Sequence, residues 1–142
     1  MAYRLLSLTA ISGEFPTDQL NRLPGSPYYL ESVVTALKKK DGLLRTYYRD
    51  KLRGYRLGPR AKATLLESRP DRFASYLTGD TDTNRLKCEI DRRLRLHRLA
   101  ETYVTMDNAG VCVYRDENRQ FLRRMVTLAA GLSILLFSVP EK

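Results

Sequence analysis

Cysteine and histidine are scarce in this 142-residue chain, which has two cysteines, Cys88 and Cys112, and one histidine, His97. The cysteines stand far apart without a Cys-x-x-Cys pair, whereas a structural zinc site takes four Cys or His ligands. We therefore expect no metal site, a reducing cytoplasmic location, and two cysteines that act as small buried apolar side chains. His97 lies among leucines and arginines and is interpreted as a packing residue.

The chain also lacks a recognisable catalytic constellation. No carboxylate cluster with a nearby lysine stands out in the first 115 residues, so a metal-dependent nuclease ranks behind the binding functions. The N-terminus has one arginine before a mildly apolar run broken by Ser7, Thr9 and Ser12, which is not a signal-peptide core. We expect no catalytic residue, no cofactor and no small-molecule substrate.

Long apolar runs are absent except for residues 125–139, MVTLAAGLSILLFSV. These fifteen residues fall short of the roughly 18 to 20 that a membrane-spanning helix needs. A core or dimer-interface helix is therefore the favoured interpretation. Arg123 and Arg124 immediately before the run keep a peripheral or marginal membrane anchor open as the alternative.

Positive charge is what the chain has in excess: 25 Lys and Arg against 16 Asp and Glu give a net charge of +9. Such a charge favours polyanionic partners, either nucleic acid or an anionic membrane surface. The 43% hydrophobic and 29% charged content is typical of a soluble globular protein of about one domain. Ten of the 25 cations fall within residues 26–62.

Residues 26–40 carry the signals of a helix. Ser26 can cap its N-terminus, and Pro27 suits the first helical position. Shorter helices predicted at residues 3–11 and 18–23 precede it, and three helices joined by short turns make a helix-turn-helix core. The helical period places Leu30, Val33, Val34 and Leu37 on a buried stripe. The opposite face then holds Tyr28, Ser32, Thr35 and Lys39.

A basic hairpin is predicted directly after this helix. Residues 43–48 form one strand, residues 49–54 the tip and residues 55–57 the returning strand, with Leu44 and Leu57 packed inward. A ribbon of this kind supplies DNA phosphate contacts. The alternatives are a solvated polar helix face and a solubilising hairpin whose edge is protected by charge. The candidate DNA-binding residues are Tyr28, Ser32, Thr35, Lys38, Lys39, Arg45, Tyr47, Arg49, Lys51, Arg53 and Arg56.

The remaining sequence divides at a polar segment. Helices are predicted at 60–67 and 70–77, a linker at 79–84, and a long helix at 85–106 followed by a short strand at 111–114. This gives a DNA-binding domain at 1–78, the linker, a helix-plus-strand unit at 85–115, and an apolar tail at 116–142. The long helix is expected to pack on the body or to pair two copies as a homodimer. Its arginines (Arg92, Arg93, Arg95, Arg98) either extend the DNA surface or, as we favour, form a solvated face.

Four segments together resemble a known family: LLSLTAISGEF (5–15), SVVTALKKKDGLLRTYYRDKLRGYRLGPRAK (32–62), RFASYLTGDTDTN (72–84) and RLKCEIDRRLRLHRLAETYVTMDNAGV (85–111). They resemble the N-terminal part of replication-relaxation-like winged-helix proteins of plasmids and integrative conjugative elements of Gram-positive bacteria, over roughly residues 4–113. The resemblance implies a cytoplasmic accessory factor that binds double-stranded DNA and works with replication or relaxosome proteins. Family members continue into a further α/β region, of which this chain has only residues 111–114.

The combined expectation is an α+β, mostly helical protein: a winged helix-turn-helix with a two-stranded wing, followed by a long helix. Its expected function is non-enzymatic, sequence-dependent binding of double-stranded DNA in replication or transfer of a mobile element. A transcriptional repressor of the element's own genes would use the same surfaces. A protein-docking module, whose basic surface binds an acidic partner, is the alternative from another class.

Overall fold

The computed structural model describes residues 1–40, 42–85, 87–115, 117, 123–124 and 126–131. Within these residues the protein is mostly helical with one small sheet, as the expected α+β class requires. The elements in chain order are α1 (Ala2–Ser12), β1 (Phe15–Pro16), the 3-10 helix η1 (Thr17–Arg22), α2 (Pro27–Lys39), β2 (Leu44–Arg49), β3 (Leu52–Leu57), α3 (Pro59–Ser68), α4 (Pro70–Leu77), α5 (Gly79–Arg85) and α6 (Ile90–Asn108).

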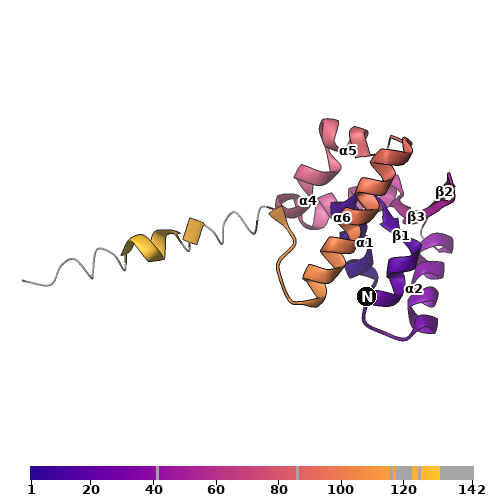
Figure 1. Ribbon diagram of the computed structural model, residues 1–142, viewed down its shortest axis with the longest axis horizontal. Coiled ribbons are helices and arrows are strands. Elements are labelled where there is room, and N and C mark those ends of the chain that lie inside the picture. Colours follow the sequence, from indigo (N-terminus) through magenta and orange to yellow (C-terminus); the bar gives the residue numbers. More distant parts are fainter. Residues whose placement is uncertain (41, 86, 116, 118–122, 125, 132–142) are drawn as a thin grey trace, which may run out of the picture.

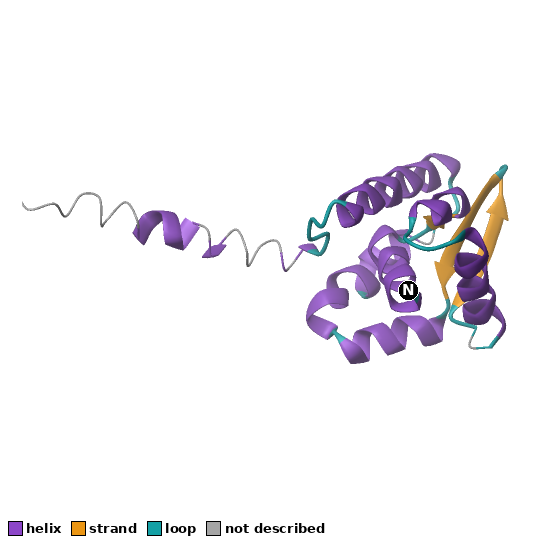
Figure 2. Ribbon diagram, turned by 90° about the horizontal axis from the view of Figure 1, so that it is seen from below, coloured by secondary structure: helices purple, strands orange, loops and turns teal. Residues whose placement is uncertain are grey.

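The sheet has three antiparallel strands in the order β1-β3-β2. Strands β2 and β3 form the predicted hairpin, with Leu44 opposite Leu57 and both side chains buried. The two-residue strand β1, which the sequence pattern did not indicate, adds Phe15 opposite Tyr55. Figure 2 shows the hairpin in orange at one side of the molecule, away from most of the helices.

Helix α1 lies at the centre of the protein, with every residue from Leu5 to Ser12 buried. Helix α6 packs along it, burying Ala100 and Val104 in the common core (Figure 1). The apolar face of the long helix is therefore covered by the chain's own α1. The homodimer expected through residues 85–106 would need another face of this helix.

The expected linker at 79–84 is wrong, because residues 79–85 form helix α5. Its polar sequence resembles a loop, but Asp80 and Asp82 fall in the first turn, where acidic side chains stabilise the positive end of the helix dipole. Asp82 also accepts two hydrogen bonds from Lys62 of α3, both 2.9 Å long. The long helix begins at Ile90 instead of residue 85, and extended backbone at Glu89 precedes it.

Residues 111–114, after α6, form no strand, so the short strand expected there is wrong. This segment contacts α4 through its side chains. Val113 is buried, the Tyr114 ring meets Phe73 edge to face at 6.0 Å, and the Arg72 guanidinium covers the Tyr114 ring at 4.0 Å. The expectation of buried cysteines is also wrong, because Cys88 is half-buried and Cys112 is exposed.

The apolar run at residues 125–139, expected to be a core or dimer-interface helix, lies only partly within the described residues. Residues 126–131 are helical and exposed, and they lie well away from the globular body (Figure 1). Among the residues that the structure describes, no helix has the length and apolar content needed to cross a membrane.

Candidate nucleic-acid interface

Helix α2 forms where the sequence predicts it, because its signals are local. The Ser26 hydroxyl accepts a hydrogen bond from the Tyr29 backbone N–H at 3.2 Å, and Pro27 occupies the first turn. The predicted inward stripe is confirmed: Leu30, Val34 and Leu37 are buried, with Val33 half-buried beside them. The stripe fixes the rotation of α2 and thereby determines which side chains face solvent.

The opposite face of α2 is fully open. Tyr28, Ser32, Thr35 and Lys39 are all exposed, as predicted, and Tyr28 keeps 84% of its surface accessible. The Ser32 hydroxyl donates to the Tyr28 carbonyl at 2.9 Å, so it remains able to accept a further hydrogen bond. This polar face (Tyr28, Ser32, Thr35, Lys39) has the donors and acceptors that contact with base edges requires.

The hairpin is longer than predicted and its turn is tighter. Asp50 and Lys51 alone make the turn, with φ of 53° and 62°, the left-handed backbone that matches the twist of a two-residue hairpin. Strand β3 consequently starts at Leu52, and the predicted tip at 49–54 is wrong. Arg53 lies within the strand opposite Tyr48, with its guanidinium 5.2 Å from the centre of the Tyr48 ring.

The two faces of the hairpin serve different purposes, since side chains alternate along each strand. One face carries Tyr48, Arg53 and Tyr55 and, with α2 and η1, borders an open groove of about 380 Å³. The groove is lined by Thr17, Leu20, Asn21, Glu31, Val34, Thr35, Lys38, Lys39, Arg53 and Tyr55. Four of the predicted DNA-binding residues, from two separate elements, therefore meet at one groove.

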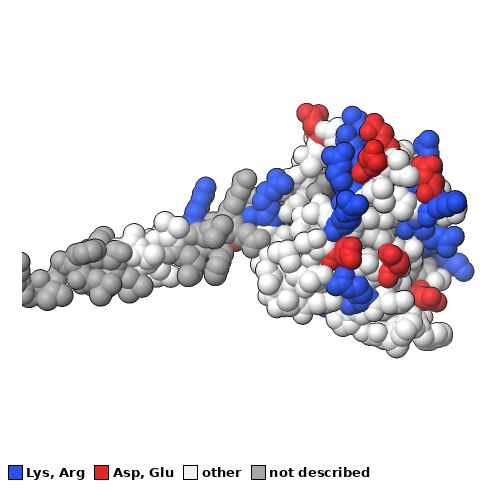
Figure 3. Space-filling view, viewed as in Figure 1, with Lys and Arg blue, Asp and Glu red and all other residues white. Residues whose placement is uncertain are grey.

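Three exposed cations line this groove: Lys38, Lys39 and Arg53. Arg45 and Arg49 project from the other face of the hairpin, since they alternate with Tyr48 along β2. Within the described part of the chain, no ion pair to a carboxylate joins Lys38, Lys39, Arg45, Lys51 or Arg53, and all five are exposed. Arg49 is exposed as well, and its Nε lies 3.7 Å from Oδ2 of the neighbouring Asp50. Figure 3 shows Lys and Arg crowding the right-hand edge, where Figure 1 places β2 and β3, while along α6 acidic side chains interrupt the cations.

Two predicted DNA-binding residues, Arg56 and Tyr47, pack on the side of the hairpin that α6 covers. Arg56 is only 9% exposed, and its Nε donates to Glu14 at 2.8 Å, so its assignment to the DNA surface is wrong. Tyr47 is half-buried, with the guanidinium carbons of Arg56 and Arg93 at 4.1 and 4.6 Å from its ring centre. The alternation of the strand places both residues on the face that turns toward α6.

A buried carboxylate, Glu14, holds this second face. It is 0% exposed and accepts hydrogen bonds from Arg56, from Arg93 Nη2 at 2.7 Å and from His97 Nε2 at 2.7 Å. Burial raises the pKa of Glu14, but the hydrogen bonds from His97, Arg93 and Arg56 outweigh it and lower the pKa to about 2. The carboxylate is therefore ionised at any physiological pH.

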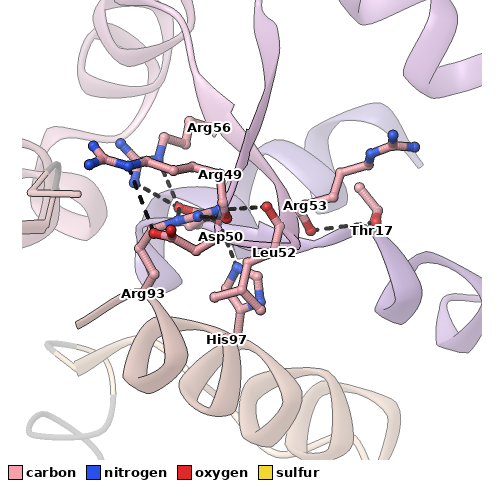
Figure 4. A network of polar contacts seen from close by, with 9 residues as sticks. Thr17, Arg49, Asp50, Leu52, Arg53, Arg56, Arg93 and His97 are labelled. Carbon is pink, nitrogen blue, oxygen red and sulfur yellow. Dashed lines mark hydrogen bonds and ion pairs between the residues drawn. The ribbon is translucent and has the colours of Figure 1, made fainter. Parts of the chain in front are cut away.

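Arg93 and His97 reach Glu14 from α6, one helical turn apart, and both point toward the hairpin in Figure 4. Arg93 is 0% exposed, so the expected solvated face is wrong for this arginine. His97 packs as expected, but it also donates to Glu14, which the sequence did not indicate. Arg93 Nη1 and Nη2 donate further to the carbonyls of Arg49 and Leu52, which flank the hairpin turn, at 2.7 and 3.1 Å.

Sequence reasoning missed Glu14 and Arg93 because the two lie 79 residues apart. The available signals were an acid between Gly13 and Phe15 in an apolar stretch, and the i, i+4 spacing of Arg93 and His97. Among the described residues, no group of three or more His, Cys, Asp and Glu could hold a metal ion. Comparisons of the chain with protein-family models, curated proteins and solved structures found no match.

Proposed function

We propose that this protein is a winged helix-turn-helix protein that binds double-stranded DNA through α2 and the β2–β3 hairpin. The order of elements supports the fold: a first helix, a short strand, two further helical segments and a hairpin, with β1 paired to β3. In this arrangement η1 and α2 are the helix-turn-helix, and the hairpin is the wing. The second helix of such a motif enters the major groove.

The observation that carries the proposal is the groove between α2 and the hairpin. It brings Thr35, Lys38 and Lys39 of a capped, exposed helix next to Arg53 of the hairpin. A duplex that placed base edges against the polar face of α2 would bring its phosphates to these cations. Glu31 at the same groove adds a repulsive group that would disfavour a misplaced phosphate.

Roles divide between the two elements. Tyr28, Ser32, Thr35 and Lys39 would contact base edges and nearby phosphates, and Lys38 would contact phosphate. Arg45, Arg49, Lys51 and Arg53 of the hairpin would bind the backbone of the same duplex. Phosphate contacts supply affinity and salt sensitivity, whereas base contacts supply sequence preference.

The resemblance to replication-relaxation-like proteins favours a cytoplasmic role in replication or transfer of a plasmid or conjugative element, alongside replication or relaxosome proteins. A repressor of the element's genes would use the same polar face on a defined operator. A docking module for an acidic protein would use the same cations but would not bind a duplex.

Affinity for a random duplex, measured at several salt concentrations, tests the proposal. Several phosphate contacts predict a log-linear fall in affinity, with a slope of about −0.9 per contact. Thr35→Ala should then change the preference among duplex sequences more than the affinity for random DNA. Thr64→Ala, at an exposed position of α3, is the matched control. Absence of duplex binding at low salt contradicts the proposal and leaves the docking module.

A further inference from the structure

Helix α6 is bonded to the hairpin turn across the interior of the protein. The Arg93 guanidinium reaches the carbonyls on both sides of the turn, Arg49 at 2.7 Å and Leu52 at 3.1 Å (Figure 4). The same guanidinium donates to Glu14. The turn carbonyls are thus connected to α6 by a side chain that is 0% exposed. A two-stranded hairpin is at best marginally stable without such packing.

A second contact fixes the same hairpin from the side of β1. Gly54 of β3 lies against Glu14, and a Cβ at position 54 would be 2.4 Å from Glu14 Oε1. Glycine is therefore required at position 54 by the close approach of the carboxylate and not by a turn. The Tyr47 ring, covered by Arg56 and Arg93, closes this side of the hairpin.

We propose that Arg93 is a positioning residue for DNA binding: with Glu14 and His97 it holds the hairpin beside α2, so that α6 sets affinity without touching DNA. This inference rests on the proposed function. Its physical basis is preorganisation, because a hairpin already held in its bound orientation loses less freedom when it contacts phosphates. Released from α6, the hairpin would bind fewer phosphates of the backbone at the same time.

The test compares Arg93→Gln with Arg95→Gln, which removes the same charge from an exposed position of the same helix. Glu14 keeps Arg56 and His97 as partners in Arg93→Gln. Amide order parameters of residues 48–53, measured without DNA, should fall from about 0.85 toward 0.6 in Arg93→Gln and stay unchanged in Arg95→Gln. Duplex affinity at 0.1 M salt should fall about eightfold for each phosphate that the hairpin no longer binds, with a shallower salt slope.

Gly54→Ala disturbs the same contact from the hairpin side and replaces Arg93→Gln where that variant does not fold. It should give the same mobile turn and the same shallower slope. An unchanged order parameter at the turn in a folded variant overturns the proposal, as does a mobile turn that binds duplex as tightly as Arg95→Gln. If the wild-type protein does not bind duplex although Arg93→Gln loosens the turn, the positioning contact stands and the proposed function is what has failed.

Discussion

Glu14 is a buried carboxylate on which three side chains converge. It takes hydrogen bonds from three side chains on two elements: Arg56 on β3, and Arg93 and His97 on α6. Desolvation of a lone carboxylate would favour its protonated form, but three donors and two fixed positive charges reverse the effect. The ionised form of one buried side chain thus joins the start of the first strand, the hairpin and the long helix.

This network predicts a defined pH dependence of stability. The pKa of Glu14 is about 2 in the folded protein against 4.5 as its ordinary value, so its contribution is complete above pH 4.5 and disappears as the pH falls toward 2. The contribution amounts to about 3 kcal/mol by the usual linkage conversion. Chemical denaturation of the protein and of Glu14→Gln should give unfolding free energies that converge by that amount between pH 5 and pH 2. A difference in unfolding free energy between the two proteins that stays constant from pH 5 to pH 2 would contradict the lowered pKa of Glu14.

Arg53 and Arg56 lie on one strand, but their substitutions are expected to affect different properties: DNA binding for Arg53 and stability for Arg56. Arg53→Ala should lower the salt slope of duplex binding by about 0.9, with a stability change of about 0.5 kcal/mol or less. Arg56→Ala should cost about 3 kcal/mol of stability, because it removes a partner of a buried carboxylate. Its folded fraction should retain the wild-type slope. A larger reduction of the slope in Arg56→Ala than in Arg53→Ala would reverse the assignment of the two faces.

At the scale of elements, local sequence signals were sufficient for α2 but not for the hairpin turn or for α5. Ser26 and Pro27 define the start of α2, and Gly42, with φ of 59°, supplies left-handed backbone shortly after its end. The turn at Asp50 and Lys51 was missed because Asn-Gly is the usual signal for this geometry. Helix α5 was missed because its Thr, Asp and Asn residues are typical of loops, and its Lys62 partner belongs to another helix.

In the candidate site too, features set by local sequence could be predicted, and features set by contacts between distant residues could not. The polar face of α2 could be predicted from helical periodicity, and the exposed hairpin cations could be predicted from composition. The interior position of Arg56 could not be predicted. The two-residue turn decides which residues of β3 point to each face of the hairpin, and the partner of Arg56 is 42 residues away. Arg93 was missed for the same reason: a buried arginine depends on a partner that only the tertiary structure provides.

The hairpin turn gives a prediction with two opposed effects. Lys51 has φ of 62°, a conformation that costs a non-glycine residue about 1 kcal/mol. Lys51→Gly should therefore raise the unfolding free energy by about 1 kcal/mol, while removal of the charge lowers the salt slope of duplex binding by about 0.9. Thermal unfolding and a salt titration measure the two effects. A lower melting temperature would contradict the turn geometry, and an unchanged slope would place Lys51 away from DNA.

For the whole molecule, the distribution of ion pairs matters more than the net charge of +9. Away from the hairpin, some arginines and lysines are paired with acids: Arg4 with Asp107, Lys62 with Asp82, and Arg72 with Glu117. Lys38, Lys39 and Arg53, which line the groove, have no such partner among the described residues. These cations add positive potential on the side where the polar face of α2 is open.

Titration of a DNA duplex into ¹⁵N-labelled protein at low salt tests the central claim most directly, because it locates the binding surface on the whole molecule. The account predicts that amide signals shift or broaden along α2 from Tyr28 to Lys39 and along the hairpin from Arg45 to Arg53. Signals of α3 and α4 should stay in place, and added salt should restore the free spectrum. Perturbations centred on the outer faces of α3, α4 or α6, or a spectrum that does not change, would contradict it.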